Sequence, residues 1–232
     1  MSFIDIVLFL FDGFKISLLI FAVTLLCGAP LGLPIAFCSM SKFKVVKTIS
    51  RVFVWIIRGV PLMLQIFIIY YVPPLLFKVN IWRDINLFFT GDDRTLSYAG
   101  SVIAVLIAFV LNYACYFSEI YRGGIESISK GQYEAGYVLG LTKSQVFRKI
   151  VLKQVIQRIV PPMSNEIITL IKDTALANCI MVGEIIYKAN ILAADKALIW
   201  PLFFTGVFYL IFVGLLTILL GKVEKKLSYF RS

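Results

Sequence analysis

Long apolar runs constrain this chain more than any other feature of its sequence. The first run, residues 16–40, holds 25 uncharged residues in succession, enough for a helix to cross a hydrocarbon core about 30 Å thick. Four more runs follow, at about 52–77, 96–118, 159–182 and 198–220. Because 60% of the 232 residues are hydrophobic, a soluble domain could not bury them all. We therefore expect an all-α integral membrane protein with about five transmembrane helices, forming a single domain over residues 1–232.

Prolines divide several of these runs. We expect Pro73-Pro74 to end the second helix, because neither residue can donate a backbone hydrogen bond. Four other prolines fall inside runs, where kinks are tolerated if neighbouring helices satisfy the freed carbonyls. These are Pro30, Pro34, Pro61 and Pro201.

The distribution of basic residues predicts the orientation. The flanks 42–51, 122–158 and 222–231 together carry 15 of the 23 Lys and Arg residues, and the flanks on the other side carry six. Because short cytoplasmic loops are enriched in Lys and Arg, we expect the N-terminus outside and the C-terminus inside. The net charge of +10 is then explained by the lipid surface, and no nucleic-acid partner is expected.

Two residue types argue against enzyme chemistry. Histidine is absent, which removes the commonest metal ligand and the usual proton shuttle. The four cysteines lie inside apolar runs without C-x-x-C spacing, so we interpret them as small hydrophobic residues. An integral membrane enzyme, such as a lipid-headgroup transferase, would need clustered catalytic groups. An ion-driven transporter would predict internal repeats, and none is found.

A polar segment of about 40 residues separates the third and fourth runs. It contains two helix-start patterns, S-x-x-Q from Ser129 and T-x-x-Q from Thr142, with Gly140 between them. We expect a short helix, a sharp turn in which Gly140 adopts positive φ, and an amphipathic second helix from 143 to about 160. The pattern alone fits either an interfacial helix pair on anionic lipid or a docking element for a soluble partner.

Charged residues also occur within or near the apolar runs, where they should face the bundle interior or water. Glu166 and Asp173 are seven residues apart and therefore share one helix face, whereas Lys172 points about 100° away. One interpretation is an internal ion pair of Arg58 with Asp173 or Glu166. The other is a substrate passage, whose candidate residues are Asp173, Glu166, Lys172 and Asn112.

Four segments resemble those of a known family. Glu134-Ala135-Gly136, Gly140, Ile150-Val151-Leu152 and Pro161-Pro162 resemble the EAA loop of ATP-binding-cassette importer permeases. Three more resemble the RGTPLLVQ, Y-x-x-E-I-x-R-G-G-I and KDTSL segments of the polar amino-acid uptake branch: residues 58–65, 116–125 and 172–176. The chain departs at Gly136 (usually Ala), Ala175 (usually Ser) and Lys153-Gln154-Val155 (usually Pro-Gln-Ala). The last change predicts that the second loop helix continues unbroken.

The resemblance implies a transport subunit. It implies a type-1 transmembrane domain at about 14–221 with a coupling loop at about 126–160, whose residues Glu134, Ala135, Gly136 and Gly140 sit in a cleft of a separate ATPase. Arg58, Gly59 and Pro61 would mark a kink near a cytoplasmic gate. The chain has no G-x-x-x-x-G-K-[ST] phosphate loop, so ATP-Mg would bind to the partner ATPase and no cofactor to this chain.

The resemblance also implies an assembly and a location. The expected partners are ATPase subunits, a second permease that is identical or a sister chain, and an extracellular or periplasmic amino-acid-binding protein. The charged outer loop 78–95 is either a docking site for that binding protein or a solvated spacer. The expected location is a bacterial or archaeal cytoplasmic (inner) membrane, which the chain crosses several times. The expected cargo is a polar amino acid, with another small solute as the alternative.

Overall fold

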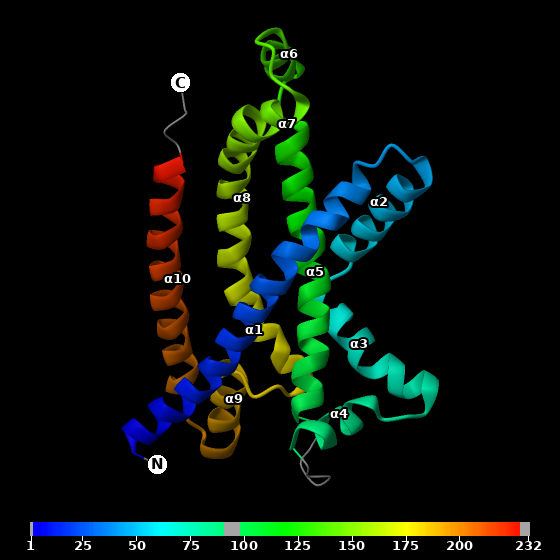
Figure 1. The fold of residues 1–232 in the computed structure, drawn as a ribbon. Coiled ribbons are helices and arrows are strands. Elements are labelled where there is room, and N and C mark those ends of the chain that lie inside the picture. Colours follow the sequence, from blue (N-terminus) through cyan, green and yellow to red (C-terminus); the bar gives the residue numbers. More distant parts are fainter. Residues whose placement is uncertain (1, 91–97, 228–232) are drawn as a thin grey trace.

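The computed structural model describes residues 2–90 and 98–227, and this part of the chain consists of helices joined by short connections, without strands. The elements are α1 Phe3–Ser39, α2 Lys44–Gly59, α3 Leu62–Phe77, α4 Ile81–Thr90, α5 Tyr98–Glu126, α6 Lys130–Val138, α7 Lys143–Val146, the π-helical η1 Phe147–Val151, α8 Leu152–Asp173, the 3-10 helix η2 Thr174–Ile180, α9 Ile185–Lys196 and α10 Trp200–Leu227. They form an elongated bundle with α5 through its middle (Figure 1).

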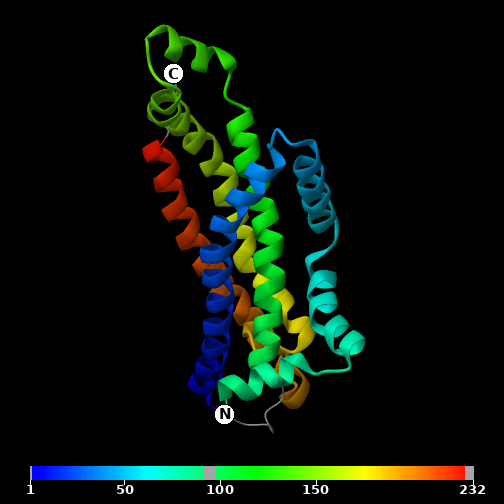
Figure 2. The same cartoon turned by 45° about the vertical axis from the view of Figure 1, so that its right-hand side comes forward.

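The described helices confirm the prediction of about five spans. Three single helices, α1, α5 and α10, are long and apolar enough to cross a membrane. Two bent pairs bring the total to five: α2 with α3, bent by 102°, and the helical segment 143–180 with α9, bent by 49°. The start of α1 and the end of α10 lie at opposite ends of the bundle, with α6 at the same end as the latter (Figures 1 and 2). This arrangement agrees with an odd number of crossings.

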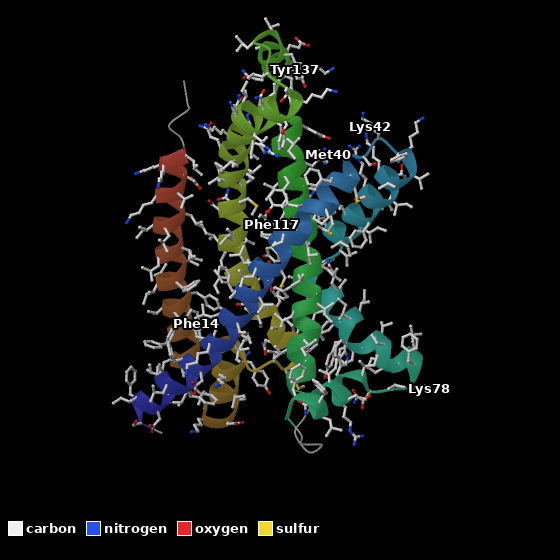
Figure 3. The ribbon with its side chains drawn as sticks, viewed as in Figure 1. Phe14, Met40, Lys42, Lys78, Phe117 and Tyr137 are labelled. Atoms are coloured by element: carbon white, nitrogen blue, oxygen red, sulfur yellow. The ribbon has the colours of Figure 1, made fainter. Side chains whose placement is uncertain are left out.

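Close packing of α1 on α5 forms the core. Gly28 and Gly32 lie one turn apart on α1, and a Cβ at Gly32 would come within 3.0 Å of the Ala114 carbonyl oxygen on α5. Small residues at this spacing allow two backbones to approach in a membrane, where packing stabilises helix association. The α5 side chains Phe109 and Phe117 are fully buried in the same cluster (Figure 3).

The prediction that Pro73-Pro74 ends the second helix is wrong. Helix α3 continues through both prolines to Phe77. Pro74 cannot donate to the Tyr70 carbonyl, but the buried Trp82 indole donates to that oxygen at 2.6 Å. A neighbouring helix thus satisfies the freed carbonyl, and the proline φ already suits a helix.

Three other boundaries differ from the sequence expectation. Helix α1 begins at Phe3 rather than near 16, because Ser2 and Asp5 form a capping box. Pro61 and Pro201 lie inside their apolar runs, as expected, but at helix starts rather than in helix interiors: Pro61 immediately precedes α3, and Pro201 lies in the first turn of α10, where a missing N–H costs nothing. The second loop helix does not end near 160, since α7, η1 and α8 follow without a break to Asp173. Its continuation through Lys153 is as predicted.

Candidate functional site

The first part of the candidate site is the loop helix α6 with the turn that follows it. Gly140 has φ of 74°, as predicted, and the Leu141 N–H donates to the Gly136 carbonyl at 3.1 Å across the turn. Thr142 and its partner Gln145 form the predicted capping box at the start of α7. Helix α6 begins after Ser129 as expected, although the Ser129 side chain makes no capping bond.

The residues of the Glu134-Ala135-Gly136 triplet face different ways. Glu134 and Ala135 are exposed, whereas Gly136 is buried against α7, and a Cβ there would lie 2.7 Å from Val146 Cγ2. Gly136 therefore serves the packing of α6 on α7 and is not itself open to a partner. The reason is the helical repeat, which turns each successive side chain by about 100°.

An apolar patch on the same helix was missed by the sequence reasoning. Tyr137, Val138 and Leu139 are 45%, 88% and 75% exposed at the far end of the molecule (Figure 3). Exposed aromatic and aliphatic side chains side by side are typical of a protein interface. The signal was available, because apolar residues directly before a turn glycine are unusual in a water-exposed loop.

The loop is firmly joined to the fourth span. Arg158 donates to the Ser127 carbonyl, and the Gln154 side-chain amide donates to the Gln132 side-chain oxygen at 2.9 Å. Beneath them lies a small core of four buried apolar residues: Ile128, Val146, Val151 and Val155. Because α8 continues this helix to Asp173, α6 is packed against the same continuous helical segment that forms the fourth span.

The second part of the candidate site is a cavity of about 530 Å³ between the α2–α3 bend, α5, α8 and η2. Its lining residues are Arg58, Gly59, Val60, Pro61, Leu62, Asn112, Tyr113, Tyr116, Glu166, Thr169, Asp173 and Leu176. Glu166 and Asp173 share a face, as predicted, and both line the cavity. Sequence reasoning missed Tyr113, whose hydroxyl donates to Asp173 Oδ2 at 2.7 Å. Its neighbour Asn112, a candidate from the sequence, also lines the cavity.

Two expectations for the cavity are wrong. Lys172 does not line it but is exposed, because the one-residue rotation turns it away from Asp173. Arg58 forms no ion pair with Glu166 or Asp173 within 4 Å. Its guanidinium lies 3.8 Å from Glu119 and over the Tyr116 ring, 4.8 Å from the ring centroid.

The kink predicted at residues 58–61 is present as the 102° bend between α2 and α3. Val60 is extended there, and the Gln65 side chain donates to the carbonyls of Ile57 and Val60 at 2.7 and 2.8 Å. Gln65 thereby satisfies carbonyls that the break leaves without helical partners. At the opposite end of the bundle, the outer loop forms α4, and residues 91–97 of that loop lie outside the described residues.

Comparisons with known proteins agree with this architecture. The chain is 33% identical over 223 residues to the arginine transport system permease protein ArtQ of Bacillus subtilis, covering 95% of this chain and 93% of that protein. It is 35% identical over 207 residues to the L-cystine transport system permease protein TcyB of the same organism, covering 88% and 80%. The putative glutamine transport system permease protein GlnP of Rickettsia prowazekii is 28% identical, with 95% and 94% covered.

Solved structures give the same result. The crystal structure of an amino acid ABC transporter with histidines is 25% identical and superposes with a TM-score of 0.80, covering 97% of this chain and 99% of that one. The inward-facing MetNI methionine ABC transporter, at 16% identity and a TM-score of 0.68, shares the fold. Residues 28–229 match the family described as the binding-protein-dependent transport system inner membrane component. The chain therefore belongs to this family, whose members are transport subunits and not enzymes.

Proposed function

We propose that this chain is the membrane permease subunit of an ATP-driven importer of polar amino acids. The observation that carries the proposal is the charge arrangement of the cavity. Arg58 contributes a guanidinium from the end of α2, and Glu166 and Asp173 contribute carboxylates from α8. A zwitterionic amino acid presents one carboxylate and one ammonium group, so such a cavity can bind both ends by charge-assisted hydrogen bonds. The names of the curated relatives support the same class of cargo.

Asp173, Glu166 and Asn112 would then bind the passing amino acid, with Arg58 on the opposing wall. Gly59 and Pro61 would shape that wall through the bend between α2 and α3. A cargo bound there contacts α8 directly, and α8 is continuous with the loop that carries α6. This continuity supports a mechanism in which movement of the loop changes the binding site.

The second half of the proposal concerns coupling. Exposed Glu134 and Ala135, together with the apolar patch Tyr137–Leu139, would sit in a cleft of a separate ATPase, with Gly136 and Gly140 fixing the shape of the loop. ATP-Mg would bind to that ATPase. The assembly would contain two ATPase subunits, a second permease and an external amino-acid-binding protein, in the cytoplasmic membrane of a bacterium or archaeon. The transport domain would cover about 14–221 of the single domain 1–232.

The test is direct binding of radiolabelled arginine, glutamine and cystine to the purified permease–ATPase complex without the binding protein. We expect Asp173→Asn to weaken binding at least tenfold, because one carboxylate of the cavity is lost. Lys172→Gln is the matched control: its exposed side chain lies outside the cavity, and binding should stay at the wild-type level. Unchanged binding in Asp173→Asn would exclude the cavity, and binding of a different small solute in place of amino acids would favour the alternative cargo.

Coupling between ATP hydrolysis and uptake is tested in proteoliposomes that contain the permease and the ATPase, with the amino-acid-binding protein added outside. Glu134→Arg should insert normally but lose uptake and co-purify with less ATPase. Full uptake by this variant would refute the coupling role of α6.

A further inference from the structure

Helix α2 is joined to the rest of the bundle mainly by polar contacts. Val54 is its one buried residue among those described. The Ser50 hydroxyl lies 2.8 Å from the Ser39 hydroxyl and also donates to the Ile35 carbonyl, and Arg51 donates to the Ser39 carbonyl. Polar contacts can be replaced by water when they separate, whereas a packed apolar interface cannot. Helix α2 therefore separates from the bundle more easily than α1 or α5.

One face of α2 carries a basic stripe, two of whose members, Arg51 and Arg58, lie close to carboxylates of α5. Lys44, Lys47, Arg51 and Arg58 follow at intervals of three, four and seven residues and therefore share that face with Val54. The stripe extends from the cytoplasmic end of α2 to the cavity, which Arg58 itself lines. The basic stripe, which begins in a flank that the sequence assigns to the cytoplasm, therefore also has acidic partners within the bundle.

Those partners form an acidic stripe on α5. Arg51 lies 3.8 Å from Glu126, and Arg58 lies 3.8 Å from Glu119. Both carboxylates have a closer partner on their own helix, because Arg122 contacts Glu119 at 2.6 Å and Glu126 at 2.5 Å. Separation of α2 from α5 would therefore leave neither carboxylate without a partner. The two longer pairs are the ones that such a movement would break.

The bend next to the cavity provides a hinge. Gly59 ends α2, and an added Cβ there would meet nothing within 4 Å, so the backbone has room to rotate. Pro61 begins the next helix in a direction 102° away. Helix α2 can thus swing about Gly59–Pro61, and the contact with α3 that such a swing would break is the hydrogen bond from the Gln65 side chain to the Ile57 carbonyl.

We propose that α2 is a gate on the cytoplasmic side of the cavity, hinged at Gly59–Pro61 and held shut by the pairs Arg51–Glu126 and Arg58–Glu119. Its role in releasing cargo rests on the proposed transport function, but its opening and closing do not. Partly exposed ion pairs are individually weak, so the closed position is readily reversed. This weakness suits a gate that another subunit must open.

The native thiol of Cys115 can be used to measure the opening of α2. Cys115 is fully buried and lies on the α5 face that carries Glu119, Arg122 and Glu126. Opening of α2 should expose its thiol. The experiment uses the full chain in inside-out membrane vesicles, with Cys27, Cys38 and Cys179 replaced by serine. The rate of Cys115 modification by a membrane-impermeant maleimide is measured by mass spectrometry.

Arg51→Gln and Glu126→Gln should each raise the labelling rate about two- to fivefold, the effect of losing one exposed ion pair. The double variant should react no faster than the faster single variant, because both substitutions remove the same pair. Lys47→Gln is the matched control: it removes a charge from the same stripe, at a residue that makes no ion pair within 4 Å among the described residues, and should label at the wild-type rate. Wild-type rates in Arg51→Gln and Glu126→Gln, or an equal increase in Lys47→Gln, would overturn the proposal.

A second variant tests the gate in the opposite direction. Ser39→Cys with Ser50→Cys places two thiols where hydroxyls are now 2.8 Å apart, and their disulfide would fix α2 to α1. The oxidised form should protect Cys115 below the wild-type rate, and reductant should restore labelling. Equal rates in both forms would refute the gate. These measurements need neither ATPase nor amino acid, so a failure of amino-acid binding would overturn the proposed function and leave the gate standing.

Discussion

The substitution Gly136→Ala should weaken the coupling loop, although it introduces the residue that the EAA triplet usually carries. The added Cβ would lie 2.7 and 3.2 Å from the two γ-carbons of Val146 and 3.3 Å from Ile150 Cδ1. Val146 is fully buried, and a β-branched side chain in a helix has one strongly preferred rotamer. The neighbour that must move is therefore the one least able to do so.

Two opposing effects set the magnitude. Overpacking a filled core costs about 1–3 kcal/mol. Replacing a helical glycine by alanine returns about 0.5–1 kcal/mol. The balance is a loss of about 1 kcal/mol in the docking of α6, or roughly a fivefold rise in the population of the open loop.

Hydrogen exchange of the α6 amides, followed by mass spectrometry, measures that population. Gly131→Ala is the matched control, because it lies on the same helix with nothing within 4 Å of the added Cβ. We expect faster exchange in Gly136→Ala and equal or slower exchange in Gly131→Ala. Adding Val146→Ala to Gly136→Ala should bring exchange back toward the wild-type rate. If the α6 amides exchange as slowly in Gly136→Ala as in Gly131→Ala, the close approach to Val146 does not prevent a larger residue at position 136.

Three further substitutions have expected effects of known direction. Gly32→Ala should lower the unfolding free energy in detergent by about 1–3 kcal/mol, because its Cβ would press on the Ala114 carbonyl at 3.0 Å. Thr142→Ala should lose the capping box of α7, at a cost of about 1 kcal/mol, seen as faster exchange at the start of that helix. Tyr113→Phe removes the 2.7 Å hydrogen bond to Asp173 and should lower the unfolding free energy by about 1.5–3 kcal/mol.

For each of these three substitutions, one result would contradict the contact on which the prediction rests. Gly28→Ala has ordinary 3.5 Å contacts and should be tolerated, so equal losses at Gly28 and Gly32 would argue against the close α1–α5 approach. Unchanged exchange in Thr142→Ala would show that the cap is dispensable. Wild-type stability in Tyr113→Phe would mean that Asp173 does not depend on this hydroxyl.

Local signals predicted the parts of the site that depend on neighbouring residues in the chain. The turn at Gly140 and the start of α7 at Thr142 were predicted because backbone conformation and capping involve residues within one helical turn. The shared face of Glu166 and Asp173 follows from helical periodicity alone. The residues Arg58–Pro61 predicted where the chain bends but not the angle of 102°. The two hydrogen bonds donated by the Gln65 side chain help to fix that angle.

Contacts between distant segments decided the rest. Helix α3 passes through Pro73 and Pro74 because Trp82, from another helix, donates to the Tyr70 carbonyl. Arg58 meets Glu119 instead of Glu166, because the side chain of Arg58 reaches α5 where the two helices pack. Neither partner can be found from spacing along the chain.

The sequence by itself determined the number of spans, the position of the loop between the third and fourth, and the segments that carry the family resemblance. Apolar runs and turn residues act on their own backbone, so their effect can be read locally. Only the tertiary structure decided that Gly136 packs inward while Val138 faces out, and that α2 meets the bundle mainly through hydrogen bonds and ion pairs. Those properties depend on which surfaces meet when the helices pack, and a single helix does not contain that information.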